Sequence, residues 1–204
     1  MINNLKNNIV AVIRIKNYEL AKAVAENIIA SGINFIELTL TIENASKLIR
    51  ELNEKYKEQD VFIGAGTVTT LDECKEVLDS NAAFVVSPIT NFEVIDYCIC
   101  NNVPILPGIG TVTEAYNCYI KGCEVVKVFP GNVLGHAFIK SALAPLPQIK
   151  FMPSGGVTLE NMNDWFDNGA YAVSIGSELY SGITLENIET IRDRVENYLK
   201  NLPK

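Results

Sequence analysis

Histidine is almost absent from this sequence, in which His136 is the only one among 204 residues. A metal site built from several histidines is therefore excluded, and no compact cluster of carboxylates replaces it. We expect neither a metal nor another cofactor. The five cysteines form no CxxC pair and no spacing typical of a disulfide scaffold, so we expect reduced thiols that act mostly as small core residues.

Positive charge and long apolar runs are also scarce. The formal net charge is −7, which argues against nucleic acid or an anionic membrane as the main partner. The chain contains no run of about 18 apolar residues, and the polar start Met1–Asn8 has no signal-peptide character. We therefore expect a cytoplasmic protein with no membrane partner. An anionic small molecule remains compatible with this composition, because backbone amides and a few local cations can bind phosphate.

Short β-branched runs alternate with helix-period segments along the whole chain. The expected strands are Ile9–Arg14, Asn34–Leu38, Val61–Gly64, Ala83–Ser87, Val103–Leu106, Glu124–Phe129, Lys150–Met152 and Ala170–Ile175. The expected helices are Tyr18–Ala30, Ala45–Tyr56, Leu71–Asp79, Asn91–Cys100, Thr113–Ile120, His136–Leu143, Leu159–Asp167 and Leu185–Leu199. Glycines after Ser31, Lys121 and Asn168 are expected to end helices, and Thr70 and Thr158 to cap the next ones.

The strand runs are apolar on both faces, which is typical of parallel strands covered by helices. Eight consecutive strand–helix units predict an α/β fold, a single-domain (β/α)8 TIM barrel over residues 1–204. A doubly wound open sheet is the alternative, but no G-x-G-x-x-G follows the first strand.

Three charged residues occupy runs that are otherwise apolar: Lys127, Glu37 and Arg14. Each falls near the C-terminal end of its strand, where barrel enzymes carry their catalytic groups. A surface ion pair explains one such residue better than it explains three. Together they indicate a nucleophile, a proton-transfer carboxylate and an anion-binding cation.

Lys127 is the most informative of the three. Side chains alternate along a strand, so Lys127 shares a face with Val125 and Phe129. An ammonium among apolar groups is costly unless it is paired or neutral part of the time. Only a neutral amine attacks a carbonyl, and an apolar barrel mouth with a second cation favours that form. The pattern favours a nucleophilic lysine, and a structural pair with Glu37 is the alternative.

Glycine-rich turns follow four of the strands: Gly64–Thr67, Pro107–Thr111, Pro153–Gly156 and Gly176–Ser177. Each alone is weak evidence, because glycine is the ordinary turn residue. The last two follow strands seven and eight, where many barrels bind phosphate through main-chain N–H groups. We interpret Gly155, Gly156, Gly176 and Ser177 as a phosphate site.

These motifs, in this order, make the sequence similar to pyruvate-dependent Schiff-base aldolases of the 2-dehydro-3-deoxy-phosphogluconate and 4-hydroxy-2-oxoglutarate type. The resemblance covers nearly the whole chain. Its motifs are Val12-Ile13-Arg14, Ile36-Glu37-Leu38-Thr39-Leu40, Gly64-Ala65-Gly66-Thr67-Val68, Ser87-Pro88, Pro107-Gly108, Lys127-Val128-Phe129-Pro130, Pro153-Ser154-Gly155-Gly156 and Gly176-Ser177.

The resemblance implies a homotrimer of barrels in which Lys127 forms the Schiff base and Glu37 is the general acid/base. It also implies reversible cleavage of 2-dehydro-3-deoxy-6-phosphogluconate to pyruvate and glyceraldehyde 3-phosphate, in carbohydrate metabolism of the Entner–Doudoroff type. Cleavage of 4-hydroxy-2-oxoglutarate to pyruvate and glyoxylate is a second implied activity. The other implied binding residues are Arg14 and Thr67 for the keto acid, Pro88 and Phe129 for the pocket wall, and Gly155, Gly156 and Ser177 for phosphate.

Two positions depart from the family pattern. Thr41 stands where many members have an arginine that contacts the substrate carboxylate, and Ser154 stands where threonine is frequent. Three other functions remain open at this point. They are an aldolase for 2-dehydro-3-deoxy-6-phosphogalactonate, a phosphosugar isomerase or epimerase on the same barrel, and a barrel that binds a ligand without catalysis.

Overall fold

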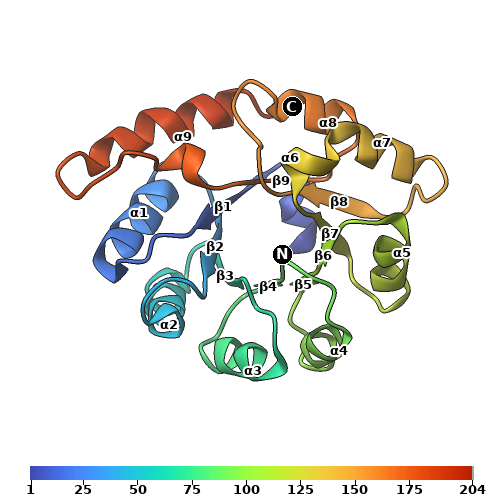
Figure 1. Cartoon of the computed structure of the whole chain (residues 1–204). Coiled ribbons are helices and arrows are strands. Elements are labelled where there is room, and N and C mark those ends of the chain that lie inside the picture. Colours follow the sequence, from blue (N-terminus) through green and yellow to red (C-terminus); the bar gives the residue numbers. More distant parts are fainter. Residues whose placement is uncertain (204) are drawn as a thin grey trace.

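Buried β-branched runs form parallel strands around a barrel in the computed structural model, which describes residues 1–203 (Figure 1). All strand pairings are parallel, and helices cover the outside, so the predicted (β/α)8 barrel is confirmed. The strands are β1 Ile9–Ile13, β2 Phe35–Thr39, β3 Phe62–Gly66, β4 Val85–Val86, β5 Ile105–Leu106, β6 Gly108–Ile109, β7 Val125–Val128, β8 Lys150–Pro153 and β9 Val173–Ile175.

The fifth barrel strand is divided in two at Pro107. Proline has no N–H to donate, and here the pairing changes sides: β5 pairs with β4, whereas β6 pairs with β7. The strands therefore form two sheets, in the orders β5-β4-β3-β2-β1-β9 and β6-β7-β8. A bridge between Ser154 and Ser174 joins β8 to β9 and completes the barrel.

The helices lie close to their predicted ranges. They are α1 Tyr18–Ala30, α2 Ala45–Tyr56, α3 Leu71–Asp79, α4 Phe92–Cys100, α5 Val112–Ile120, α6 Gly131–Leu134, α7 His136–Leu143, α8 Met162–Asp167 and α9 Ile191–Lys200. Gly32, Gly122 and Gly169 follow helix ends with positive φ, as expected. Thr70 caps α3 through a capping box with Glu73. No helix within residues 1–203 is both long and apolar enough to cross a membrane.

Several predicted boundaries are wrong. The first strand ends at Ile13, and the main-chain N–H of Arg14 donates to the Tyr180 hydroxyl instead. Thr158 does not cap α8, because the Asn161 side chain accepts from the Thr158 N–H and delays the helix to Met162. The last helix begins at Ile191 rather than Leu185. The short helix α6 was not expected from the sequence.

The barrel interior is filled toward the N-terminal ends of the strands. Phe35, Phe84, Val125 and Met152 belong to one buried cluster inside the barrel. The 3-10 helix Ile2–Leu5 contributes Ile2 and Leu5 to the same cluster and so covers the N-terminal ends of the strands. The space that stays open inside the barrel lies toward the C-terminal ends of the strands. Four of the five cysteines are buried, and Cys100 is exposed.

We predict a measurable pH dependence from the capping box of α5, which fixes the turn after β6. Hydrogen bonds from the Gly110 N–H, and from the Thr111 N–H and hydroxyl, hold the pKa of Glu114 below its usual range. A lowered folded-state pKa gives stability that is present above the unfolded pKa of about 4.3 and is lost as pH falls through the folded value.

Glu114→Gln should therefore lower stability by about 0.3–1 kcal/mol at pH 7, the contribution of a negative charge at a helix N-terminus, and thermal melts should show the Tm gap to wild type narrowing toward pH 3. Glu58→Gln, on an exposed side chain, is the control that should change Tm little at either pH. An equal gap at both pH values for Glu114→Gln would refute the ionic contribution.

Candidate active site

Lys127 and Glu37 meet inside the barrel. Lys127 projects from β7 and Glu37 from β2, and Lys127 Nζ lies 3.6 Å from Glu37 Oε1. Their side chains are 3% and 0% exposed, so both charges are removed from bulk water. Lys127 Nζ also lies 5.4 Å from the centroid of the Phe129 ring, on the same face of the strand. The strand pattern of the sequence thus places an amine and a carboxyl together at one buried point.

Glu37 is held in an unusual environment for a buried carboxylate. Neither of its oxygens accepts a hydrogen bond from any group within residues 1–203. Buried polar atoms are normally satisfied, and those that are not are concentrated at functional sites. Gly66, at the end of β3, makes room for this side chain, because a Cβ there would lie 2.5 Å from Glu37 Cγ. The surroundings position the carboxyl and leave its oxygens available to a ligand.

Arg14 and Thr67 lie together beside this pair. Arg14 Nη2 donates to Thr67 Oγ1 over 3.3 Å. The Arg14 N–H donates to the Tyr180 hydroxyl over 3.0 Å, which holds the chain where β1 ends. Burial raises the pKa of Tyr180, and the neighbouring Arg14 opposes that rise. The guanidinium is thereby fixed at the rim of the barrel.

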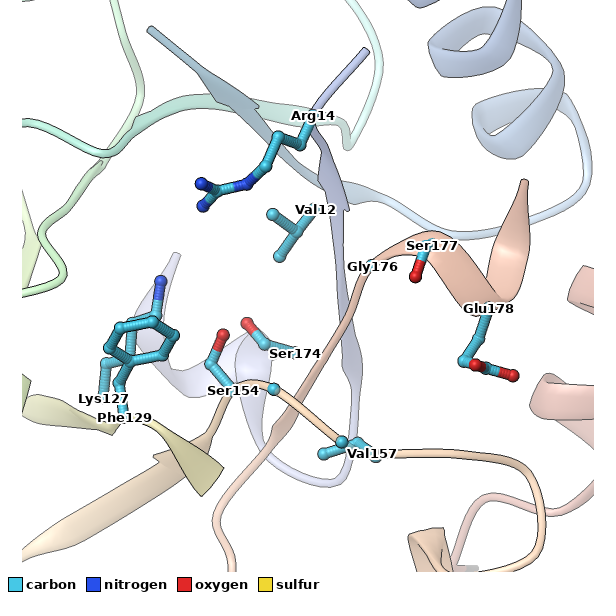
Figure 2. A pocket seen from close by; sticks show the side chains of 12 residues that line it. Val12, Arg14, Lys127, Phe129, Ser154, Val157, Ser174, Gly176, Ser177 and Glu178 are labelled. Carbon is cyan, nitrogen blue, oxygen red and sulfur yellow. The ribbon is translucent and has the colours of Figure 1, made fainter. Parts of the chain in front are cut away.

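A cavity of about 260 Å³ opens next to Lys127 at the C-terminal ends of the strands (Figure 2). Its wall is formed by side chains and glycines from β1, β7, β8, β9 and the loops that follow them. They are Val12, Arg14, Lys127, Phe129, Ser154, Gly155, Gly156, Val157, Ser174, Gly176, Ser177 and Glu178. The volume suits a small organic substrate, and the buried amine of Lys127 is part of its wall.

The far end of the cavity consists of main chain. Gly155 and Gly156 have φ of 91° and 75°, a left-handed conformation that favours glycine. A Cβ on Gly156 would also lie 2.6 Å from Asn132 Cβ, in the unexpected helix α6. The N–H groups of Gly156 and Ser177 donate no hydrogen bond to another group of residues 1–203. Such free N–H groups in a concave turn can bind an anion.

Seven of the predicted site residues line the cavity: Arg14, Lys127, Phe129, Gly155, Gly156, Gly176 and Ser177. Glu37 and Thr67 are connected to it through Lys127 and Arg14. Pro88 is not part of the cavity wall; it lies just after β4, where its main chain packs against Gly108. The Thr41 hydroxyl is hydrogen-bonded to Thr39 Oγ1 over 2.7 Å.

The sequence analysis did not identify three residues of this region. Ser174 is a small residue in an apolar strand, and nothing in the pattern distinguishes it from a packing residue. Tyr180 reaches Arg14 across a sequence separation of 166 residues. Glu178 lines the cavity with an exposed side chain, whose carboxylate points away from Lys127 in Figure 2. Only the barrel register places Ser174 beside Ser154.

No group of three or more His, Cys, Asp or Glu side chains among residues 1–203 is arranged to hold a metal ion. The chemistry that this site offers on its own is that of an amine beside a carboxyl. An amine adds to a carbonyl, and the adjacent carboxyl can move the protons that the addition requires.

Comparison with known proteins gives a consistent result. A family model described as KDPG and KHG aldolase matches residues 2–195. The 2-dehydro-3-deoxy-phosphogluconate aldolase of Treponema pallidum is 35% identical over 158 residues, which are 77% of this chain and 74% of that protein. The 2-dehydro-3-deoxy-6-phosphogalactonate aldolase of Escherichia coli is 30% identical over 173 residues, 84% of each protein.

The chain is also similar to a solved structure. It is a KDPG aldolase from Legionella pneumophila with pyruvate captured as a covalent carbinolamine intermediate. The TM-score is 0.84 at 26% sequence identity, and the match covers 99% of this chain and 97% of the other.

Proposed function

The chain belongs to the KDPG and KHG aldolase family and is a class I aldolase, a carbon–carbon lyase, and from this premise we propose that it cleaves 2-dehydro-3-deoxy-6-phosphogluconate reversibly to pyruvate and glyceraldehyde 3-phosphate. The observation that carries the proposal is the 3.6 Å separation of Lys127 Nζ and Glu37 Oε1 inside a barrel that excludes bulk water from both. Lys127 is the nucleophile and Glu37 the general acid/base.

Bond formation begins at the substrate ketone. The neutral amine of Lys127 adds to C2, and Glu37 supplies the proton with which water leaves, so a protonated imine remains. This imine withdraws electrons from the neighbouring carbons and weakens the C3–C4 bond. The free carboxylate oxygens of Glu37 suit this task because they accept no other hydrogen bond in the described residues.

Cleavage follows from the same pair of groups. Glu37, directly or through one water, takes the proton of the C4 hydroxyl, and the C3–C4 electrons move to the imine. The aldehyde departs, and an enamine of pyruvate stays on Lys127. Protonation of the enamine at C3 by Glu37 and hydrolysis of the imine release pyruvate and restore both side chains.

The residues at the two ends of the cavity support a phosphorylated keto acid as the substrate. We assign the keto-acid portion to Arg14 and Thr67, with Phe129 as the wall, and the phosphate to the N–H groups of Gly155, Gly156, Gly176 and Ser177. The free N–H groups of Gly156 and Ser177 support the second assignment. Pro88 contributes to the barrel wall through its contact with Gly108, and we do not assign it to the ligand.

Thr41 changes the expected recognition of the carboxylate. Its hydroxyl is hydrogen-bonded to Thr39, and it replaces the family arginine with an uncharged group. Arg14 is the only cation that lines the cavity besides Lys127 in the described residues, so we assign the substrate carboxylate to Arg14. One bidentate guanidinium–carboxylate pair can replace two weaker contacts.

Two related compounds are alternative candidates for the natural substrate. An aldolase for phosphogalactonate is supported by the Escherichia coli relative, and an activity on 4-hydroxy-2-oxoglutarate by the KHG/KDPG aldolase of the same species, which is 32% identical over 158 residues. The test is an assay of pyruvate release from all three compounds. We expect the highest kcat/KM for the phosphogluconate compound, and a higher value for either competitor would replace the assignment. Family membership sets aside the isomerase, epimerase and non-catalytic alternatives.

We also propose that the protein is a homotrimer, as the family resemblance implies. Exposed apolar side chains on the neighbouring helices α4 and α5 support a contact surface. They are Phe92, Ile99, Val112, Tyr116, Tyr119 and Ile120. Light scattering should give three times the chain mass of 22.5 kDa, and the mass of a single chain would contradict the proposal.

Gly66→Ala should slow turnover without preventing imine formation. The added methyl group would overlap Glu37 and displace its carboxyl, and misplacing a catalytic group by about 1 Å costs roughly 100-fold in rate. Steady-state kcat is the measurement. Gly110→Ala is the matched control, because the nearest atoms to its Cβ are 3.9 Å away. Equal kcat values for the two variants would contradict the role given to Glu37.

A further inference from the structure

Two buried thiols are in contact between the neighbouring helices α3 and α4, outside the barrel sheet (Figure 1). Cys74 Sγ in α3 lies 3.3 Å from Cys98 Sγ in α4, and both residues are 0% exposed. The mechanism described above uses neither thiol. A disulfide places its two sulfurs about 2.05 Å apart, so these two would have to approach each other by only roughly 1.2 Å. The contact therefore brings together the two partners of a possible disulfide.

The two thiols differ in reactivity. The hydrogen bond with Cys98 lowers the pKa of Cys74, against the opposite effect of burial. The same hydrogen bond, burial and the nearby thiol of Cys123 raise the pKa of Cys98. The thiolate, and not the thiol, is the nucleophile that reacts with an oxidant. Cys74 is therefore the first of the pair to react, and Cys98 is already in contact with it.

A second cavity comes close to this pair from the solvent. It has a volume of about 240 Å³ and lies at the N-terminal ends of the strands, with Ile2, Cys123 and Glu124 in its wall. Cys123 is near enough to Cys98 to affect its pKa, so the floor of the cavity lies near the two helices. Both helices have only nine residues, and short elements open locally without unfolding of the whole chain. A small uncharged oxidant can reach the pair by this route.

We propose that Cys74 and Cys98 form a modification site, at which a peroxide produces a reversible disulfide that links α3 to α4. The Cys74 thiolate attacks one peroxide oxygen, the O–O bond breaks, and the released hydroxide takes the proton that the Cys74 thiol has lost. Water leaves, and Cys74 remains as a sulfenic acid. The sulfur of Cys98 then attacks the sulfenic sulfur, and the sulfenic oxygen leaves with the Cys98 proton as a second water. One peroxide is thereby reduced to two waters while two thiols are oxidised to one disulfide, which a thiol reductant reverses by exchange.

The link would join two helices that already support the loops at the catalytic end of the barrel. Glu73, next to Cys74, accepts hydrogen bonds from the N–H groups of Thr69 and Thr70 in the loop after β3. Asn91, which caps α4, donates to the Thr69 carbonyl over 2.9 Å. A covalent link across this segment restricts the unfolded chain and raises stability. We therefore expect the oxidised protein to melt at a higher temperature than the reduced protein.

The test is oxidation of the whole protein with hydrogen peroxide. Cys100→Ser serves as the background, because it removes the exposed thiol that would otherwise react first. Peptide mapping without reductant should find Cys74 linked to Cys98, and the intact protein should lose the mass of two hydrogen atoms. The Tm should rise by about 5–10 °C. Dithiothreitol should restore both the original mass and the original Tm.

Cys74→Ala and Cys98→Ala, each in the same background, should show no rise in Tm after peroxide. The rise is measured within one variant, before and after oxidation, so a less stable variant does not alter the comparison. Cys118→Ala is the matched control, since Cys118 is equally buried but belongs to α5, and it should keep the full rise. A disulfide between any other two cysteines, an unlinked pair in the oxidised protein, or a Tm that does not rise when the link is present would overturn the proposal.

Discussion

Lys127→Met is expected to lower kcat/KM for aldol cleavage by at least about 10⁴-fold, the scale observed when a covalent nucleophile is removed. Methionine keeps most of the side-chain volume in the barrel but cannot add to a ketone. Pyruvate release from the phosphogluconate compound is the measurement. Retention of a tenth of the activity would show that the reaction does not pass through an amine at this position.

In that experiment, activity lost because Lys127→Met is less stable must be distinguished from activity lost because the amine is missing. Removing one member of a buried ion pair costs about 3–5 kcal/mol, because the other charge is left without a partner. The double variant Lys127→Met/Glu37→Gln removes both charges and should melt at a higher temperature than Lys127→Met while remaining inactive. Lys150→Met is the control, since Lys150 lies over the Tyr171 ring at the start of β8, and it should keep its activity.

Glu37→Gln is expected to lower kcat by about 10² to 10⁴-fold, the usual contribution of a general acid/base. Glutamine has the same shape, but it is too weak a base to take the proton of the C4 hydroxyl and too weak an acid to protonate C3. Lys127 remains, so pyruvate should still be trapped by borohydride in this variant. Rapid-quench measurement of the imine and steady-state measurement of turnover together separate the two steps.

A matched substitution checks that the effect belongs to the site. Glu51 also pairs with lysine, Lys22, but on partly exposed helices outside the barrel. Glu51→Gln should leave kcat unchanged, since an exposed pair contributes about 0–1 kcal/mol to stability and does not touch the cavity. A kcat for Glu37→Gln equal to that of Glu51→Gln would remove Glu37 from the mechanism.

Local pattern was sufficient to predict the barrel and the charged residues Lys127 and Glu37 that meet inside it. Apolar runs buried on both faces give parallel strands, and side-chain alternation alone placed Lys127 beside Val125 and Phe129. The meeting of Lys127 with Glu37 also followed, because the carboxyl ends of all strands lie at one end of a barrel. What the sequence supplied here was the position of a charge within an apolar strand.

Interactions over long sequence distances could not be predicted in the same way. Tyr180 satisfies the Arg14 N–H, and no local signal connects two residues so far apart. Ser174 depends on the register of β9 against Ser154, which one residue of slippage would reverse. The loss of Thr158 as a cap depends on the competing Asn161 side chain. In each case a partner outside the local pattern decided the outcome.

Trapping with borohydride in the presence of pyruvate tests the central claim most directly. A covalent imine reduced in place leaves a stable pyruvate adduct on the amine that formed it, and peptide mapping identifies that amine. We predict one adduct per chain, on Lys127, absent when either reagent is omitted. An adduct on another lysine, or an unmodified Lys127 in a protein that turns over substrate, would contradict the account.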